Sequence, residues 1–250
     1  MKRIIALVLA AIMVASFAGC KKDNKKADKL VVGITEFEPM DYKDESGNWV
    51  GFDADMAKAF AKSLGKEAEF VVIEWDNKIS ELNNGTIDCV WNGMTLTDDV
   101  KSAMSCSKAY CNNAQIVIVK KSVADKYKTA ADCKSLTFAV EAGSAGEKAA
   151  KENGFKYTGV QDQATALTEI AAGTSDAAII DSLMAAAMVG EGTSYEDLTY
   201  TVSLSDEEYG VGFKKGSELT EKLNKFLDDS LASGETKKIA EKYGVQASIK

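Results

Sequence analysis

One sequence pattern occurs twice and constrains the fold more than any other feature of the chain. Residues 81–91 read ELNNGTIDCVW and residues 169–179 read EIAAGTSDAAI, so a helix end, Gly-Thr, an Asp and an apolar strand recur 88 residues later. The apolar residues 30–34 and 136–140 form a second matched pair. Chance similarity of a common helix-Gly-strand turn is the alternative, but two similar α/β lobes are the simplest interpretation.

The first half of the chain alternates strand-like and helical segments. The predicted order is strand 30–34, helix 53–65, strand 68–75, helix 76–84 and strand 87–91. Asp53 is the expected N-cap of the first helix, and Gly65 is its expected terminator. Strands that alternate with helices predict βαβ units and a largely parallel sheet in each lobe.

Two strand-like runs are expected to connect the lobes, residues 115–119 and residues 209–213. Lobe 1 would then be discontinuous, with lobe 2 inserted into it. The predicted division assigns residues 30–114 and 209–250 to lobe 1 and residues 115–208 to lobe 2. The cleft between two such lobes is the natural place for a ligand.

The first twenty residues predict export and a lipid anchor. Met1-Lys2-Arg3 is basic, residues 4–18 are apolar, and Cys20 follows small residues, so residues 1–20 are similar to a lipoprotein signal peptide that ends at a lipobox Cys. Phe17 stands where that motif usually has Leu. A plain signal peptide with an incidental Cys is the alternative. Residues 21–29 are Lys-rich and predict a flexible tether, so the expected location is extracytoplasmic and anchored to the cell membrane.

The residue composition excludes several classes of function. The chain has no His, and Arg3 is its only arginine, so His-based catalysis, His metal sites and a guanidinium clamp on a carboxylate are excluded from the mature chain. A net charge of −8 without a basic stripe argues against nucleic acid. We expect no cofactor and no metal.

Export permits disulfides among four cysteines, Cys89, Cys106, Cys111 and Cys133. Two bridges in any of three connectivities, or free thiols, fit the sequence equally.

Ligands of open α/β sheets bind beyond the carboxyl ends of strands, and this rule selects candidate residues. The segment EAGSAGEKAA places a loop of small residues before a helix, which predicts an anion site for its backbone N–H groups. Asp181 ends an apolar strand and suits an ammonium group or the N-cap of helix 182–189, and the two roles can coexist. Phe37, Tyr42 and Trp75 either wall the ligand or belong to the core.

Five segments taken together resemble one family. In chain order they are VGFDADMAKAFAKSLG, FVVIEWDNKISELNNGTIDCVWNGMTLT, AVEAGSAGEKAA, AAIIDS and YGVGFKKGSELTEKLNKFL. They are similar to the extracytoplasmic solute-binding proteins of polar amino acid ABC transporters, bacterial family 3. The resemblance implies a two-lobed α/β fold of the periplasmic-binding-protein type II, in which each lobe is a mostly parallel sheet flanked by helices and two crossover strands join the lobes.

The resemblance also implies ligand-binding roles. Aromatic rings would sandwich the solute side chain, one segment of lobe 1 and one loop of lobe 2 would hold its amino and carboxylate groups, and an acidic residue would bind the ammonium. The corresponding residues here are Phe37, Trp75, Asn92, Gly93, Thr95, Glu141, Ser144, Ala145 and Asp181, with Glu141 at a variable pocket position.

The chain departs from the family pattern at Val100, which occupies the place of an arginine that clamps the ligand carboxylate. A charge-assisted hydrogen bond contributes roughly 1.5 to 3 kcal/mol, so its loss would weaken binding about ten- to a hundredfold unless another group compensates. Lys101 should point elsewhere on a helix, and Lys108 is a nearby candidate. Either weaker donors such as Thr95 and Ser144 hold the carboxylate, or the ligand lacks one.

The expected function is a lipid-anchored, monomeric receptor that closes around an amino acid or close derivative and delivers it to an ABC transporter permease. A dehydratase-like enzyme on the same fold, with Glu141 or Glu36 as general acid, is one alternative. A sensor or adhesin lipoprotein that has lost solute binding is the other.

Overall fold

Short, largely apolar runs form the strands of lobe 1 in the computed structural model, which describes residues 28–250. β4 (Glu67–Val72), β1 (Lys29–Ile34) and β5 (Cys89–Thr95) lie side by side and parallel. The helices α1 (Phe52–Ser63) and α2 (Lys78–Asn84) return the chain between them. Each crossover therefore follows the predicted βαβ order.

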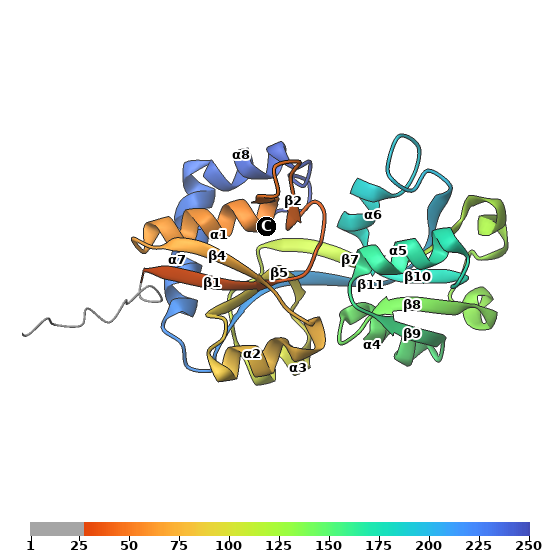
Figure 1. Cartoon of the computed structure of the whole chain (residues 1–250), viewed down its shortest axis with the longest axis horizontal. Coiled ribbons are helices and arrows are strands. Elements are labelled where there is room, and N and C mark those ends of the chain that lie inside the picture. The colour runs from red at the N-terminus through yellow and green to blue at the C-terminus, as the bar shows by residue number, and fades with distance from the viewer. Residues whose placement is uncertain (1–27) are drawn as a thin grey trace, which may run out of the picture.

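Lobe 2 repeats this arrangement. β10 (Ala177–Asp181), β8 (Thr137–Glu141) and β9 (Lys156–Val160) are parallel neighbours. α4 (Ala145–Asn153) and α5 (Gln163–Ala172) are the crossover helices, and they cover opposite faces of the sheet (Figure 1).

Two long strands join the lobes. β7 (Cys111–Lys120) and β11 (Leu198–Phe213) pair antiparallel from Leu198↔Lys120 to Tyr209↔Cys111. β11 continues beside β5 in lobe 1, and β7 continues beside β10 in lobe 2. The strand order β4-β1-β5-β11-β7-β10-β8-β9 therefore runs through both lobes without a break.

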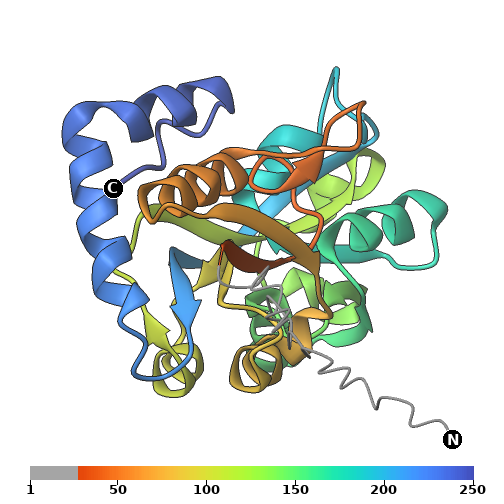
Figure 2. The ribbon, with the colours of Figure 1, turned by 60° about the vertical axis from the view of Figure 1, so that its left-hand side comes forward.

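The remaining elements are shorter segments and the C-terminal helices, and Figure 2 shows these helices along the outside of lobe 1. They are β2 (Tyr42–Lys43), β3 (Trp49–Val50), α3 (Asp98–Ala103), β6 (Ser105–Cys106), α6 (Ser182–Met188), α7 (Leu219–Ser233), α8 (Glu235–Lys242) and the 3₁₀ turns Trp75–Asn77, Lys121–Lys126 and Asp132–Ser135.

The two-lobed α/β fold with two connecting strands is confirmed, whereas the division at residues 114/115 and 208/209 stays a prediction. Residues 1–20 with Cys20, and residues 21–27 of the predicted tether, lie outside the described residues. Lys29, predicted as the end of the tether, is instead the first residue of β1, where it pairs with Glu67 in register. Within residues 28–250, no helix combines the length and apolar character needed to cross a bilayer.

Two local predictions differ from the structure. Asp53 does not cap α1, because the helix begins at Phe52 after Gly51 and the Asp53 carboxylate turns inward. The strand predicted to end at Trp91 continues to Thr95, because Tyr209 of β11 pairs with Thr95. The four cysteines at positions 89, 106, 111 and 133 are unpaired in the described part of the chain, and all except Cys106 are buried.

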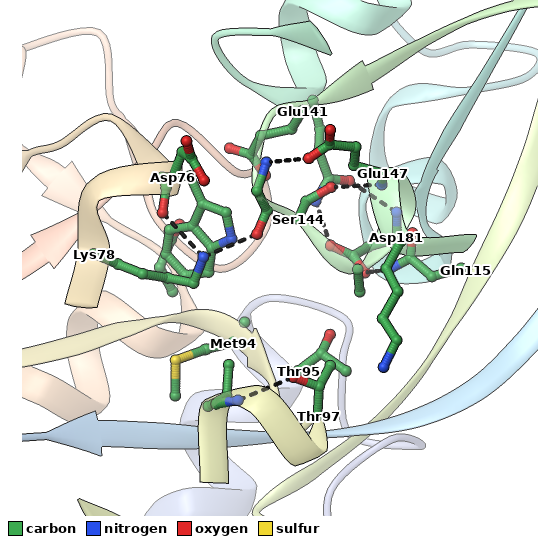
Figure 3. A pocket seen from close by; sticks show the side chains of 18 of the residues that line it. Asp76, Lys78, Met94, Thr95, Thr97, Gln115, Glu141, Ser144, Glu147 and Asp181 are labelled. Carbon is green, nitrogen blue, oxygen red and sulfur yellow. Dashed lines mark hydrogen bonds between the residues drawn. The ribbon is translucent and has the colours of Figure 1, made fainter. Parts of the chain in front are cut away.

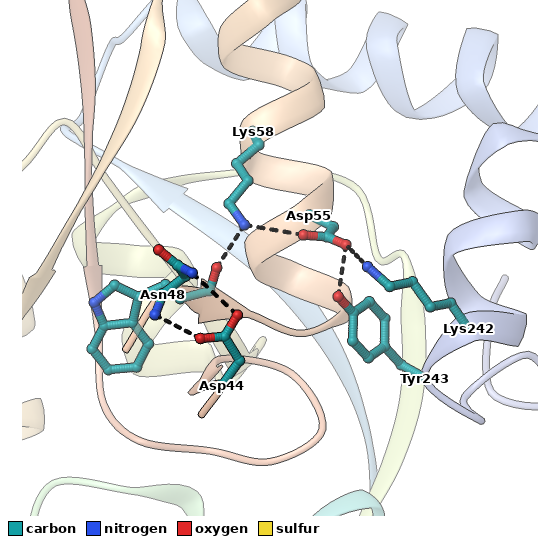
Figure 4. A network of polar contacts seen from close by, with 7 residues as sticks. Asp44, Asn48, Asp55, Lys58, Lys242 and Tyr243 are labelled. Carbon is teal, nitrogen blue, oxygen red and sulfur yellow. Dashed lines mark hydrogen bonds and ion pairs between the residues drawn. The ribbon is translucent and has the colours of Figure 1, made fainter. Parts of the chain in front are cut away.

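Polar contacts to Asp55 fasten the C-terminal helix to α1 (Figure 4). One carboxylate oxygen accepts hydrogen bonds from Lys242 Nζ at 2.8 Å and Tyr243 Oη at 2.6 Å, and the other accepts from Lys58 Nζ at 3.1 Å. Burial alone would raise the pKa of Asp55, but the hydrogen bonds from Lys242, Tyr243 and Lys58 outweigh it and lower the pKa below its usual value.

We predict that Asp55→Ala lowers the free energy of unfolding by about 1 to 2 kcal/mol at neutral pH, because three donors lose one charged acceptor. A lowered carboxyl pKa stabilises the fold above the pKa of the unfolded chain, and acid removes that contribution as Asp55 is protonated. The difference from wild type in urea unfolding should therefore shrink at acid pH.

The matched control is Asp125→Ala, which removes a fully exposed carboxylate from its ion pair with Lys128. That variant should unfold at nearly the same urea concentration as wild type, because water screens an exposed ion pair. Equal losses in the two variants would show that the Asp55 contacts do not fasten the helix.

Candidate functional site

A cavity of about 380 Å³ lies between the two lobes, within the size range of small-molecule sites. The structure brings all nine predicted ligand-binding residues to its walls. They are Phe37, Trp75, Asn92, Gly93 and Thr95 from lobe 1, and Glu141, Ser144, Ala145 and Asp181 from lobe 2. Figure 3 shows Thr95 and Met94 on one side of the cavity and Glu141, Ser144 and Asp181 on the other. Tyr42 does not line this cavity, and Glu36 lines a separate hollow.

The Asn92 side chain ties β5 to the loop after β1 and is fully used within lobe 1. Its Oδ1 accepts from the Thr35 N–H at 3.0 Å and the Thr35 hydroxyl at 2.9 Å. Its Nδ2 donates to the Thr35 carbonyl at 3.0 Å and to Asp41 Oδ2 at 2.8 Å. Asn92 therefore fixes the shape of the wall, and its amide has no donor or acceptor to spare for a ligand.

Gly93 must be glycine because Phe37 lies against its backbone. Its φ is +55°, and a Cβ there would lie 2.5 Å from Phe37 Cε1. Phe37 packs edge-on against Tyr209, with ring centroids 6.3 Å apart. The aromatic wall of the cavity therefore depends on a position without a side chain.

Two buried carboxyl groups stand behind this wall. Asp53 Oδ2 accepts from the Gly93 N–H at 2.7 Å and the Tyr110 hydroxyl at 2.6 Å, while Asp41 holds Asn92. Burial raises the pKa of Asp53 to about 7, although the hydrogen bonds from Tyr110 and Gly93 oppose the shift. Burial, and then the neighbouring Asp53, raise the pKa of Asp41 well above its usual value. The protonation states of Asp53 and Asp41 therefore affect the hydrogen bonds that hold Gly93 and Asn92 in the cavity wall.

The lobe 2 wall is the N-terminus of α4. The Ser144 hydroxyl caps this helix by accepting from the Glu147 N–H at 3.1 Å, and its own hydrogen is left to donate. Gly146 lets the helix approach β10, since a Cβ there would lie 2.9 Å from the Ile179 carbonyl oxygen. The loop predicted as an anion site thus faces the cavity with a helix N-terminus behind it.

Asp181 lies among side-chain amides and does not cap α6. Its Oδ1 accepts from Asn113 Nδ2 and Gln115 Nε2, each at 2.5 Å, and its Oδ2 accepts from Gln163 Nε2. The same amides of Asn113 and Gln115 also donate to Glu207 Oε1. Burial, and then the charge of Glu207, raise the pKa of Asp181 well above its usual value. An ammonium group in the cavity would stabilise the ionised form of Asp181 and so oppose this rise in its pKa.

Glu141 has a buried oxygen without a partner. Its side chain is only 3% exposed, and Oε1 has no hydrogen bond with any of residues 28–250. Burial raises the pKa of Glu141 to about 8; Asp162 adds to the shift, while Thr35, Lys78 and Gln163 oppose it. Gln115 Oε1, also at the cavity, is a second buried acceptor without a donor in the described chain. Such atoms favour a ligand rich in N–H groups.

Lys78 connects the lobes and was missed by sequence reasoning, because nothing in a short polar helix marks it. Its Nζ donates to the Trp75 carbonyl at 3.0 Å in lobe 1 and to the Gly143 carbonyl at 2.9 Å in lobe 2. The same nitrogen lies 4.9 Å from the Trp75 ring centroid. The lobes therefore touch beside the cavity, and burial lowers the pKa of Lys78.

Val100 lies in the cavity wall, buried, with its backbone N–H donating to the Thr97 hydroxyl. Neither lysine considered as a substitute for the family arginine is at the cavity. Lys101 does not line it, and Lys108 forms an ion pair with Asp228 on α7. The lysines that do line the cavity are Lys78, Lys148 and Lys151.

The described chain matches known proteins along nearly its whole length. The model of bacterial extracellular solute-binding proteins, family 3, matches residues 30–246. The arginine-binding extracellular protein ArtP of Bacillus subtilis is 32% identical, and the alignment covers 97% of this chain and 98% of that protein.

Solved structures of this kind have the same fold. A mutant of ArgBP from T. maritima superposes with a TM-score of 0.80 at 32% identity, covering 88% of this chain and 96% of that one. An ancestral amino acid-binding protein, AncCDT-1, described as a precursor of cyclohexadienyl dehydratase, superposes with a TM-score of 0.79 at 34% identity, covering 87% and 96%. The fold of residues 28–250 is thus the type II arrangement that the resemblance implies.

We predict that the unfolding free energy of the wild type falls as the pH is raised from about 4 to about 7, in part because of Asp53. A carboxyl whose pKa is raised on folding stabilises the fold below its unfolded pKa, and this contribution is lost as the pH rises through about 7. Asp53→Asn, which mimics the protonated acid, should make the slope shallower in urea unfolding measured at several pH values. Asp125→Asn should leave the slope unchanged, and identical slopes for Asp53→Asn and wild type would rule out the linkage.

Proposed function

Since this chain belongs to the family 3 bacterial extracellular solute-binding proteins, we propose that it is a receptor that closes its two lobes around an α-amino acid and delivers it to an ABC transporter permease. Binding and hinge closure are the whole mechanism. The observation that carries the proposal is that all nine candidate residues line one cavity between the lobes.

The lining of the cavity favours an amino acid with a positively charged side chain. Asp181 and Glu141 are both buried carboxyl groups, and burial raises the pKa of each, so a positively charged group in the cavity would stabilise their ionised forms. Asp181 is the proposed partner of the α-ammonium, and Glu141 is the proposed partner of a second donor on the ligand side chain. The relatives reported above that are named for arginine agree with this choice.

The ligand side chain would lie between Phe37 and Trp75. Both rings line the cavity and are almost fully buried, so they offer apolar faces to a long side chain or to a planar cation. Lys78, held over Trp75 by two carbonyl groups, supports the position of that ring.

The lipid anchor is proposed from the sequence of residues 1–20 alone. Acylation of Cys20, followed by a short polar tether, would keep the receptor at the cell membrane, where the permease lies.

An enzyme is the second candidate, because Glu141 is a buried acid at the cavity whose pKa of about 8 leaves it protonated at neutral pH. The relatives are named as binding proteins, and AncCDT-1 is itself described as amino acid-binding. A receptor returns its ligand unchanged, so loss of ligand during incubation with purified protein, followed by chromatography, would favour the enzyme.

We predict that a thermal-shift screen of the natural amino acids finds ligands that raise the melting temperature of the wild type. At a ligand concentration of 100 times Kd the gain is about 2.7 kcal/mol, which corresponds to roughly 5 to 10 °C for a chain of this size. Asp181→Ala should abolish the shift, because the ammonium loses its carboxylate.

The control for this experiment is Asp229→Ala, which removes an exposed carboxylate on α7 far from the cavity lining. It should keep the full shift. A wild-type protein that no amino acid stabilises would contradict the proposed function, and a full shift in Asp181→Ala would contradict the role of Asp181.

We also predict that Glu141→Gln weakens binding of arginine and lysine about ten- to a hundredfold and leaves glutamine nearly unaffected, because only the cationic side chains lose a charged partner. Isothermal titration calorimetry measures this difference. Glu36→Gln makes the same charge change outside the cavity and should have no such selectivity.

The affinity for arginine should depend on pH, because Glu141 binds a cation only when it is ionised. Glu141 faces Lys78, Asp162 and Asp181, and with a pKa of about 8 it must lose a proton before it pairs with a cation. Affinity of the wild type for arginine should therefore rise between pH 6.5 and pH 8.5. Glu141→Gln should flatten that rise, and an equal rise in the variant would exclude Glu141 as its source.

A further inference from the structure

The cavity has no arginine for a ligand carboxylate, and lobe 1 offers no replacement at that place. Val100 is apolar and only 6% exposed, and its backbone N–H donates a hydrogen bond to the Thr97 hydroxyl. The donors available to a carboxylate are the Thr95 hydroxyl, the Ser144 hydroxyl and the N–H groups that begin α4. These groups are neutral, so the ligand carboxylate still lacks a cation.

A second hollow, of about 370 Å³, adjoins the cavity, and one of the three cavity lysines, Lys148, lines both. Four residues line both hollows and therefore lie at their boundary: Thr95, Thr97, Ala145 and Lys148. Thr95 and Ala145 belong to the two segments, one from each lobe, that are expected to hold the ligand carboxylate. Lys148, on the first turn of α4, thus shares the boundary with both of them.

The other two lysines of the cavity are already committed. Lys78 is buried and donates to the carbonyl groups of Trp75 and Gly143. Lys151 forms an ion pair with Glu147 at 3.0 Å, and its Nζ lies 5.9 Å from the Tyr157 ring centroid. Neither can leave its position without breaking contacts that shape the lobe 2 wall.

Lys148 is the least restrained of the three. Its ion pair with Glu152 is 3.9 Å long, beyond hydrogen-bond distance, and the Glu152 side chain is 65% exposed. Such a pair contributes little, because water screens it. Lys148 can therefore turn toward the carboxylate of a bound ligand and lose little free energy when its pair with Glu152 breaks.

We infer that Lys148 binds the α-carboxylate of the ligand and supplies, from lobe 2, the positive charge that the family arginine supplies from lobe 1. This inference rests on the proposed function and specifies the ligand further, since it requires a free carboxylate. Because α4 belongs to lobe 2 and Thr95 to lobe 1, the two groups meet the same carboxylate only when the lobes are closed. The charge therefore stabilises the closed, loaded receptor.

Lys148→Met is the test, with L-arginine, L-lysine and the α-amides of both as probes in isothermal titration calorimetry. The variant should lose about ten- to a hundredfold in affinity for the two acids, because a charge-assisted hydrogen bond is removed. Its affinity for the amides should stay within about twofold of wild type. The side chain is 45% exposed, so the substitution leaves the fold intact.

Lys151→Met is the matched control, because it removes a second cavity lysine from the same helix. It should affect acids and amides alike. Lys148→Arg keeps the charge and should retain the preference for acids over amides, which a purely structural role of the lysine stem would not require.

Different failures have different meanings. Equal affinity of Lys148→Met and wild type for arginine, or equal losses for acids and amides, would overturn the inference and leave the proposed function standing. Wild-type protein that binds none of the four probes, and that no natural amino acid stabilises in the thermal-shift screen, would overturn both.

Discussion

The antiparallel pairing of β7 with β11 is the interaction on which the rest of the structure depends. Its ladder runs from Leu198↔Lys120 to Tyr209↔Cys111 and is the joint between two otherwise separate α/β lobes. The same strands carry Gln115, Glu207 and Tyr209 to the cavity region. A joint made of two extended strands, with lobe contacts such as Lys78 to the Gly143 carbonyl beyond it, suits a hinge that opens and closes around a ligand.

The absence of arginine and histidine from residues 28–250 gives the site its electrostatic character. Buried carboxylates are commonly paired with a cation such as a guanidinium, but here side-chain amides donate most of the hydrogen bonds to them. Asn113 and Gln115 each donate to both Asp181 and Glu207, so two acids share two neutral donors. Amides satisfy hydrogen bonds without cancelling charge, so burial and the charge of Glu207 still raise the pKa of Asp181, and a positively charged group in the cavity would stabilise its ionised form.

Local sequence patterns did not predict the hydrogen bonds between residues that are far apart in the sequence. Asp53 has the residue type and position of a helix N-cap, yet its carboxylate binds Gly93 of β5 and Tyr110. Asn92 lies at the cavity, and no local pattern in the sequence indicated that its side-chain amide would hydrogen-bond to Thr35 and Asp41. Capping propensity is a property of a few neighbouring residues, whereas these contacts join segments that are 40 to 57 residues apart.

The sequence by itself determined the strand and helix order and the two-lobed fold, because apolar periodicity and strand ends are local patterns. Its resemblance to a family supplied the nine residues that the structure brings to the cavity. It also determined that the family arginine is replaced by Val100. Only the tertiary structure decided which groups remain free to act. Contacts made in three dimensions decide the partners of Lys78, Lys148 and Lys151 and leave one oxygen of Glu141 without a partner among residues 28–250. No single segment of the sequence specifies these contacts.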